Sequence, residues 1–274
     1  MGTGVIKVKR SSAMPSALRC LRLLEIMAGH PCDISLTEIA CALSVPTSSA
    51  HRIISTLISA GFIDQDSSTR RYSLTGKVLW IGTAFLRQAE VYRSTYGAMQ
   101  RLAQRAEIMV HLGVWDDGTV LYLHTTGPPQ SLYRFTDIGE RQPAYCTALG
   151  KVLLAYRSPE EVRRALGDRP RRHTDTTITS LPEMNEELQK IRETGYAVDN
   201  GEQFPNVRCV AAPIRNEHRE VIAALSISGS LQQFADARLS EFANLVQETA
   251  LKASIQLGFR PIALNWISDS SATS

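Results

Sequence analysis

A chain of 274 residues has room for one large domain or two ordinary ones, because a domain averages roughly 150 residues. Hydrophobic residues make up 43% of the chain and charged residues 21%, which is typical of globular proteins and excludes a collagen-like, coiled-coil or disordered chain. The net charge of +3 is unevenly spread: residues 1–76 carry eight Lys or Arg against five Asp or Glu, whereas the rest carries 22 of each. This distribution predicts a small basic unit that faces phosphate, followed by a neutral unit.

The sequence contains no targeting or redox signature. No run of 18 apolar residues occurs, and residues 1–20 lack a continuous apolar segment followed by a small-residue cleavage site. The five cysteines are odd in number and form no CxxC pair, and no further ligand joins His111 and His124 in a tetrahedral metal set. We therefore expect a cytoplasmic protein with no membrane partner, no metal and no other cofactor.

Residues 16–75 have the pattern of three helices followed by a hairpin, after a mobile basic arm at 1–15. Ser35, with Glu38 three residues later, predicts a capping box at the start of the second helix, and Pro46 suits the first turn of the third. Two short strands around a polar turn complete a winged helix-turn-helix. The expected apolar stripe of the first helix comprises Ala17, Cys20, Leu21, Leu24, Met27 and Ala28.

The third helix has two chemically different faces. The apolar face comprises Ala50, Ile53, Ile54, Leu57 and Ile58. The opposite face is polar and basic, as a recognition helix in the major groove requires. We expect DNA contacts from Thr47, Ser48, Ser49, His51 and Arg52 on this helix and from Arg70 and Arg71 in the wing. Arg52 is the expected guanine contact because its guanidinium donates twice, and a helix-wing module that binds protein instead of DNA is the alternative.

Residues 76–91 form a helical stripe with no core of its own, which predicts a linker helix that packs on a partner chain or a neighbouring domain. A second domain is expected at 92–258, before a C-terminal tail at 259–274. Its expected helices are 92–106, 147–156, 159–166, 182–194 and 236–257, and its expected strands are 108–115, 119–125, 132–138, 196–199, 208–214 and 221–228. This order predicts an α+β domain with a central antiparallel sheet flanked by helices.

Two groups of residues in the second domain suggest a ligand site. The helix expected at 147–156 starts with small residues that leave backbone N–H groups accessible to an anion such as a carboxylate. Asp199, Cys209, Ser226 and Ser228 come from three expected strands, whose alternation puts the two serines on one face. Two alternatives remain open: a solvent-facing strand for the serines, and a cysteine hydrolase that uses Cys146 with His124 as its partner.

Three segments resemble IclR-type bacterial transcription regulators. They are LTEIACALSVPTSSAHRIISTLISAGFIDQDSSTRRYSL at 36–74, YCTALGKVLLA at 145–155, and GYAVDNGEQFPNVRCVAAPI at 195–214 followed by AALSISG at 223–229. The resemblance implies a winged helix, a linker helix and a GAF-like effector-binding domain, assembled as a homodimer or a dimer of dimers. It also implies that Ala148 and Leu149 line an effector pocket with Asp199, Cys209, Ser226 and Ser228, and that Tyr145, Leu149 and Val207 set its size.

The sequence departs from the family pattern at four positions. Ser44 stands where a turn glycine is usual, Tyr145 and Cys146 where His and a small residue are frequent, and Asn206 where glycine is common.

The residue patterns and the resemblance together predict a ligand-responsive DNA-binding regulator that acts as a repressor. Its affinity for double-stranded operator DNA is expected to change when a small organic acid binds Tyr145, Cys146 and the other pocket residues.

Overall fold

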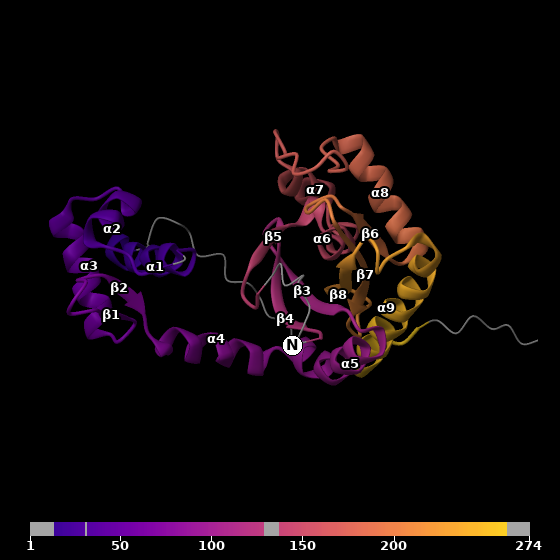
Figure 1. The fold of residues 1–274 in the computed structure, drawn as a ribbon, viewed down its shortest axis with the longest axis horizontal. Helices are drawn as coiled ribbons and strands as arrows, with labels where there is room; N and C mark the ends of the chain where they lie inside the picture. Colours follow the sequence, from indigo (N-terminus) through magenta and orange to yellow (C-terminus); the bar gives the residue numbers. More distant parts are fainter. Residues whose placement is uncertain (1–13, 31, 129–136, 262–274) are drawn as a thin grey trace, which may run out of the picture. The chain divides into compact units, whose positions relative to one another are not determined.

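The computed structural model describes residues 14–30, 32–128 and 137–261, and it divides into two compact units, one ending at Phe85 and the other beginning at Leu86 (Figure 1). Residues 1–13 of the expected basic arm and residues 262–274 of the expected tail lie outside the described residues. So does most of the strand expected at 132–138.

The first unit is a three-helix bundle with a two-stranded wing. Its elements are α1 (Pro15–Ala28), α2 (Leu36–Leu43), α3 (Thr47–Ser59), β1 (Ile63–Gln65) and β2 (Tyr72–Leu74), with the two strands antiparallel. Ser35 and Glu38 form the predicted capping box, and Ser44 ends α2 in the left-handed conformation at φ 54°. One hydrophobic core joins the three helices and both strands, so the predicted winged helix-turn-helix is confirmed.

The burial of α1 differs from the expected stripe. Leu23, which was not expected in the stripe, is fully buried and Met27 is buried with it. Three members of the expected stripe, Ala17, Leu21 and Ala28, are exposed. No residue of α1 before Cys20 reaches the core, so the assumption of burial along the whole helix was wrong. Ile58, expected on the apolar face of α3, is likewise 38% exposed, whereas the neighbouring Leu57 is buried.

The second unit contains one antiparallel sheet with the strand order β5-β4-β3-β8-β7-β6 (Figure 1). Its strands are β3 (Met109–Asp116), β4 (Thr119–Thr126), β5 (Arg141–Pro143), β6 (Ala197–Asn200), β7 (Val207–Arg215) and β8 (Val221–Ser230). β5 was not predicted, because its three residues have no strand pattern of their own and are held by pairing with β4.

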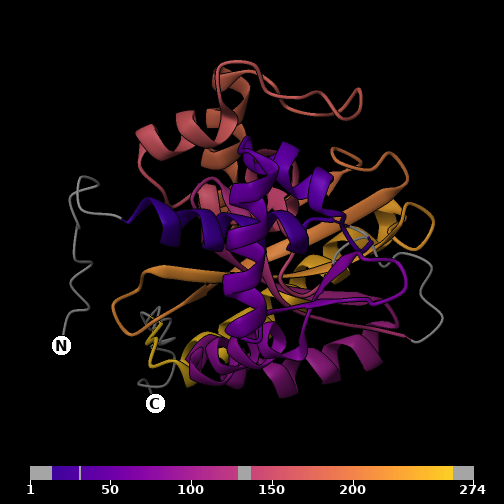
Figure 2. The ribbon, with the colours of Figure 1, turned by 90° about the vertical axis from the view of Figure 1, so that its left-hand side faces the viewer.

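Helices cover both faces of this sheet (Figures 1 and 2). On one face, α5 (Glu90–Ala106) and α9 (Asp236–Gln256) pack on alternate strand residues such as Val110, Val210 and Ile227. The other face packs against α6 (Ala148–Leu154), α7 (Pro159–Leu166), α8 (Leu181–Thr194) and the short 3-10 helix η2 (Ala144–Cys146). The α+β class with a flanked antiparallel sheet is therefore confirmed, and the second face leaves room for polar side chains beside α6.

Between the wing and the sheet, α4 (Gly76–Gln88) buries none of its side chains within the described residues. Ala89, which follows it, is extended at φ −69° and ψ 101° and serves as the N-cap residue of α5. Residues 90 and 91 of the expected linker helix therefore belong to α5. The shorter helix α4 packs Leu86, partly buried, against the core of the second unit, whereas its Leu79, Trp80 and Phe85 are exposed.

Gly150 lies where α6 packs against the backbone of η2, and a substitution at this position tests how closely the two helices approach. A Cβ at Gly150 would lie 2.2 Å from the carbonyl oxygen of Ala144 and 2.3 Å from its Cα. Gly150→Ala therefore forces α6 away from η2, and we expect the free energy of unfolding to fall by about 1–3 kcal/mol in denaturant titrations. Gly97→Ala in α5 is the matched control, since its nearest neighbour is the mobile end of Arg101 at 3.4 Å. Equal stabilities of the two variants would contradict the packing.

Candidate functional site

The polar face of α3 is presented to solvent. Thr47, Ser48, His51 and Arg52 are exposed and Ser49 is half-buried. The opposite side chains, Ala50, Ile53, Ile54 and Leu57, are buried against the other helices of the bundle. The apolar face thus fixes α3 on the bundle and leaves a polar strip available to a partner, which is the arrangement that a recognition helix needs.

A groove between α1 and α3 extends this strip. Arg19 and Ser16 of α1 line it together with Arg52 and Ser49 of α3. Two guanidinium groups beside a hydroxyl-lined groove are suited to a phosphodiester. The sequence analysis missed Arg19, because the sequence alone does not reveal that α1 packs against α3 in this way.

The two arginines of the wing have different surroundings. Arg70 is exposed in the wing turn at φ 58°. Arg71 was expected to contact DNA, but its guanidinium donates to the carbonyl oxygen of Asp33 at 2.8 Å and to Glu38 at 2.9 Å. Through these two hydrogen bonds, Arg71 connects the wing to the start of α2. The Ser35 side chain and amide, with Arg71 as a weaker contributor, lower the pKa of the Glu38 carboxyl below its ordinary value.

The pocket of the second unit lies on the α6 side of the sheet. Asp199 of β6 lies opposite Cys209 of β7, which in turn lies opposite Ser228 of β8. Two residues before Ser228 on β8, Ser226 lies opposite His111 of β3. Directly opposed residues share a face, so these five side chains form two adjacent polar rows. The described lining comprises His111, Tyr122, Thr147, Ala148, Leu149, Asp199, Gln203, Phe204, Val207, Cys209, Ser226 and Ser228.

Seven of the nine residues expected in the pocket lie in its wall, and two do not. The Tyr145 hydroxyl donates to the carbonyl oxygen of Arg171 at 2.8 Å. Cys146 is fully buried, and burial raises the pKa of its thiol to about 12. His124 contacts Tyr92 and Tyr96 on the α5 side of the sheet, so it is not a partner for Cys146. A protonated thiol without a base is no nucleophile.

The space inside the pocket is about 30 Å³, far below the roughly 150 Å³ of a protein cavity that holds benzene. An effector of more than a few atoms must therefore displace lining side chains. Gln203 and Phe204, which follow β6 and which the sequence analysis missed, are part of that wall. His111, Tyr122 and Thr147 were also missed as pocket residues, although cross-strand register with Ser226 places His111 there once the strand order is known.

The backbone N–H groups at the start of α6 are less accessible to an anion than the sequence analysis expected. Thr147 caps the helix and accepts the amide of Gly150 at 3.1 Å, so this N–H is not open to an anion. Gly150 is needed instead for the close approach of Ala144. Thr147, Ala148 and Leu149 contribute their side chains to the pocket wall.

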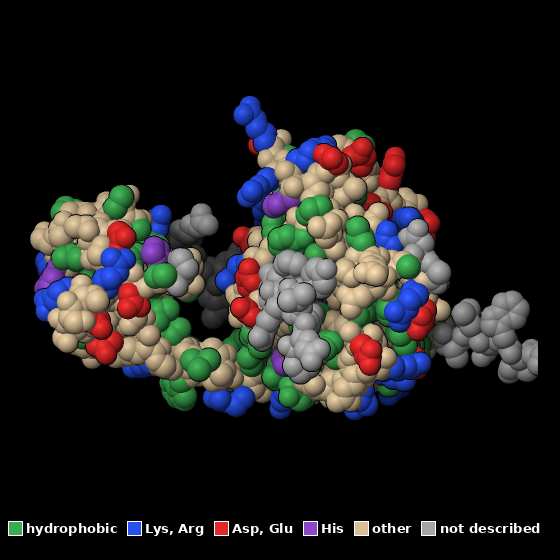
Figure 3. All heavy atoms as spheres, in the orientation of Figure 1, with side chains coloured by type: hydrophobic (Ala, Val, Ile, Leu, Met, Phe, Trp, Pro, Cys, Tyr) green, Lys and Arg blue, Asp and Glu red, His purple; other side chains and the backbone are tan. Residues whose placement is uncertain are grey.

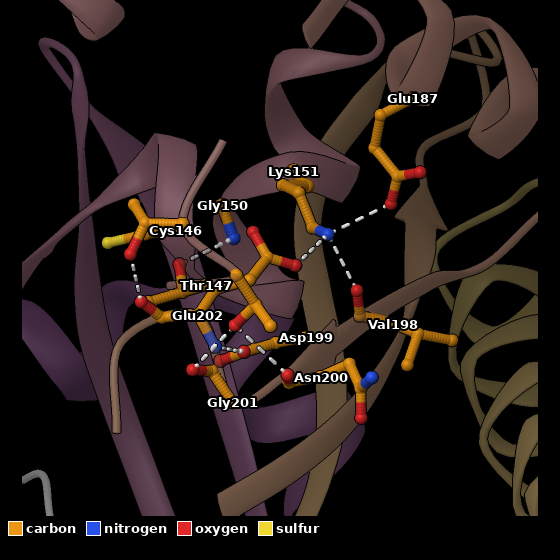
Figure 4. Close-up of polar contacts among 12 residues, drawn as sticks. Cys146, Thr147, Gly150, Lys151, Glu187, Val198, Asp199, Asn200, Gly201 and Glu202 are labelled. Carbon is orange, nitrogen blue, oxygen red and sulfur yellow. Dashed lines mark hydrogen bonds and ion pairs between the residues drawn. The ribbon is translucent and has the colours of Figure 1, made fainter. Parts of the chain in front are cut away.

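Beside the pocket, Lys151 of α6 forms a buried ion cluster (Figure 4). Its ammonium, only 1% exposed, donates to Glu187 at 2.9 Å, to the carbonyl oxygen of Val198 at 2.6 Å and to Glu202 at 2.5 Å. Burial alone would lower the pKa of Lys151, but the carboxylates of Glu202 and Glu187 outweigh burial and raise it. Lys151 therefore remains charged, and all three of its protons are donated to these acceptors.

Asp199 is a titratable residue of the pocket wall whose protonation near pH 7 differs from that of an exposed carboxyl group. It is 4% exposed, and its Oδ1 accepts the amide of Glu202 at 2.7 Å. Burial, with a further contribution from the negative charge of Glu202, raises the pKa of Asp199 to about 7. Burial and the neighbouring His124 lower the pKa of His111 to about 4, so this imidazole is neutral near pH 7.

A winged helix-turn-helix unit followed by an α+β unit with a small pocket beside α6 is the architecture of a two-domain transcription regulator. Residues 16–67 match the profile of the IclR helix-turn-helix domain, and residues 83–255 match that of the bacterial transcriptional regulator IclR C-terminal domain. The chain therefore belongs to the IclR family of DNA-binding transcription regulators, as the resemblance predicted. Since these domains and the relatives are those of regulators, the protein is not an enzyme, and the hydrolase alternative is wrong.

Individual relatives agree with this assignment. The chain is 33% identical over 252 residues to the HTH-type transcriptional regulator KdgR of Escherichia coli, a match that covers 92% of this chain and 95% of KdgR. The crystal structure of the IclR transcriptional regulator from Alicyclobacillus acidocaldarius superposes with a TM-score of 0.80 at 28% identity, over 90% of this chain and 100% of that one. An IclR homolog from Microbacterium hydrocarbonoxydans complexed with 4-hydroxybenzoate shares the fold, with a TM-score of 0.78 at 23% identity over 88% and 98% of the chains.

No group of three His, Cys, Asp or Glu in the described part of the chain is placed to hold a metal ion. Within the same ranges, no helix is both long and apolar enough to cross a membrane.

The raised pKa of Asp199 predicts a pH-dependent stability. Between the ordinary carboxyl value of 3.8 and about 7, the folded protein holds a proton that the unfolded chain has lost, so this group makes stability fall as pH rises through that window. Asp199→Asn removes the ionised state and keeps the acceptor for Glu202. We expect the variant to gain in melting temperature relative to the wild type on going from pH 5 to pH 8, by about 3 °C or more.

The control for this experiment is Asp168→Asn, since Asp168 is exposed. Its melting temperature should follow that of the wild type at both pH values in scanning calorimetry. A constant difference between Asp199→Asn and the wild type would show that Asp199 is ionised throughout.

Proposed function

We propose that this IclR-family regulator binds operator DNA as a homodimer, or as a dimer of dimers, and represses transcription until a small carboxylate occupies the pocket beside α6. The observation that carries the proposal is the exposed polar strip of α3 opposite the buried side chains of Ala50, Ile53, Ile54 and Leu57. A dimer bound across a promoter denies that DNA to other proteins, which is the physical basis for repression. A reporter gene behind the promoter distinguishes repression from activation.

The DNA contacts come from three places on the first unit. Thr47, Ser48, Ser49, His51 and Arg52 reach base edges and adjacent phosphates from α3, and Arg70 reaches phosphate from the wing. Arg19 adds a sequence-independent contact across the groove from Arg52. Arg71 is not part of this set, because Glu38 and Asp33 hold its guanidinium.

Exposed apolar side chains support the homodimer. On α4, Leu79 is 70% exposed, Trp80 62% and Phe85 53%, and α1 exposes Leu18 and Leu21 in the same unit (Figure 3). Large apolar side chains exposed together on one helix, as on α4, favour an interface. A second copy of the chain is the partner that suits it, because one helix-wing unit makes too few contacts to bind an operator tightly and two units read two half-sites.

The pocket supports a small effector with hydrogen-bonding oxygens. Asp199, Ser226 and Ser228 present polar groups, and Leu149 and Val207 limit the size of the guest. Another family member is known in complex with 4-hydroxybenzoate, which is an aromatic carboxylate. Because the unoccupied space is so small, occupancy shifts the wall of the pocket, and the effector changes operator affinity through its different affinity for the two arrangements.

The DNA-binding surface is tested by comparing two arginines. Arg52→Ala should weaken binding to the protein's own promoter duplex by about 1–3 kcal/mol and reduce discrimination against unrelated DNA. Arg19→Ala should weaken binding to both duplexes alike and reduce the slope of log affinity against log salt by about 1. Fluorescence anisotropy at several salt concentrations measures both effects. Arg22→Ala is the control, because Arg22 is an exposed arginine of α1 that does not line the groove. Equal DNA affinities of all three variants would contradict the proposed DNA-binding surface.

The dimer interface is tested by placing a charge on α4. We expect Trp80→Asp to convert the dimer to a monomer in light scattering coupled to size exclusion, because an unpaired carboxylate would be buried between the copies. Ile138→Asp places the same charge at an apolar side chain of the second unit that is 51% exposed, and it should leave the mass unchanged. A Trp80→Asp protein that retains the wild-type mass would exclude α4 from the interface.

A further inference from the structure

Among the described residues that line the pocket none is Lys or Arg, so this part of the wall offers no permanent cation to pair with a carboxylate. Its titratable members other than Asp199 are His111, Tyr122 and Cys209. Burial lowers the pKa of His111 and raises the pKa of the Tyr122 hydroxyl and of the Cys209 thiol, so all three are uncharged near pH 7.

The nearest ammonium does not supply the missing charge. The three protons of Lys151 are donated to Glu187, to Glu202 and to the carbonyl oxygen of Val198 (Figure 4). Two carboxylates therefore already surround the single cation. Lys151 is also absent from the described pocket wall, so a ligand in the pocket does not reach its ammonium.

The groups around Asp199 make its ionised form a poor neighbour for an anion. Glu202, in the turn after β6, adds negative charge, and Lys151 of α6 offsets only part of it. The thiols of Cys209 on β7 and Cys146 in η2, and the hydroxyl of Tyr122 on β4, also face Asp199 and are neutral. A carboxylate ligand would thus place a second negative charge beside an ionised Asp199, and like charges at close range disfavour each other.

We propose that the pocket takes up its carboxylate effector together with one proton, which Asp199 carries as a neutral carboxylic acid. The proton comes from solvent and forms an O–H bond on the carboxyl of Asp199, while the effector remains an anion and accepts a hydrogen bond from that O–H. The amide of Glu202 donates to Oδ1, and the backbone of Gly201 also hydrogen-bonds to this carboxyl. This inference rests on the carboxylate proposed above as the effector.

The proton makes effector affinity depend on pH. Below the pKa of Asp199 the acid is already protonated and affinity is constant; above it, each pH unit weakens binding tenfold. The raised pKa of about 7 for Asp199 places this change in the physiological range. The regulator therefore responds to an organic acid more strongly when the pH is low.

Isothermal titration calorimetry of the full-length protein tests the proposal, with pyruvate and 4-hydroxybenzoate as probes that remain carboxylates throughout. The Kd should rise by about 30-fold from pH 6 to pH 8.5, as follows from a proton held with a pKa near 7. Titrations at pH 8.5 in two buffers of different ionisation enthalpy count the proton directly, and close to one per site should be taken up.

Two near-isosteric variants identify the group that holds the proton. Asp199→Asn should bind either probe with no proton uptake and with a Kd that is independent of pH, because the amide donates permanently. His111→Gln should keep the pH dependence of the wild type. The reverse pattern, with uptake lost in His111→Gln and retained in Asp199→Asn, would overturn the proposal by placing the proton on the imidazole.

Two further outcomes separate this inference from the proposed function. If the probes bind with the same Kd at pH 6 and pH 8.5, proton uptake is refuted while the carboxylate effector stands. If neither probe binds at either pH, the carboxylate assignment itself fails and this inference fails with it, whereas operator binding through α3 is unaffected.

Discussion

The ammonium of Lys151 is a full charge almost completely removed from water, and the wall of the pocket is arranged around it. Such a charge is tolerated only where opposite charges and hydrogen bonds replace its hydration. Its acceptors come from three separate segments: Glu187 from α8, Val198 from β6, and Glu202 from the turn that follows. The cluster therefore fixes these segments against α6. Burial, together with the negative charge of Glu202, keeps Asp199 protonated up to about pH 7, and the attraction of Lys151 offsets only part of this effect.

The sheet separates this polar chemistry from the main core. Its α5 and α9 side is apolar, whereas its α6 side carries the rows from Asp199 to Ser228 and from Ser226 to His111. In the function proposed above, the effector binds between the sheet and α6, next to the turn that Glu202 holds. In that proposal, small movements of this turn let occupancy bias the regulator between two arrangements.

Much of this architecture follows from local sequence patterns, and the exceptions have a common cause. The capping box of Ser35 and the two faces of α3 depend on residues close in sequence, and strand alternation with the family resemblance brought Asp199, Cys209, Ser226 and Ser228 to one wall. Arg71, Tyr145 and Lys151 could not be assigned in this way, because their partners Asp33, Arg171 and Glu187 lie about one to three elements away in the chain. The stripe of α1 was wrong for a related reason, since burial there depends on how far α2 and α3 extend along it.

The most direct test of the central claim, a neutral Asp199 buried beside the ion cluster of Lys151, is infrared difference spectroscopy of the wild type against Asp199→Asn as the pH is varied. The account predicts the carbonyl stretch of a protonated carboxylic acid that disappears with a midpoint near pH 7. A signal that disappears near the ordinary carboxyl value of 3.8 would show that Asp199 is a carboxylate under physiological conditions and would contradict the account.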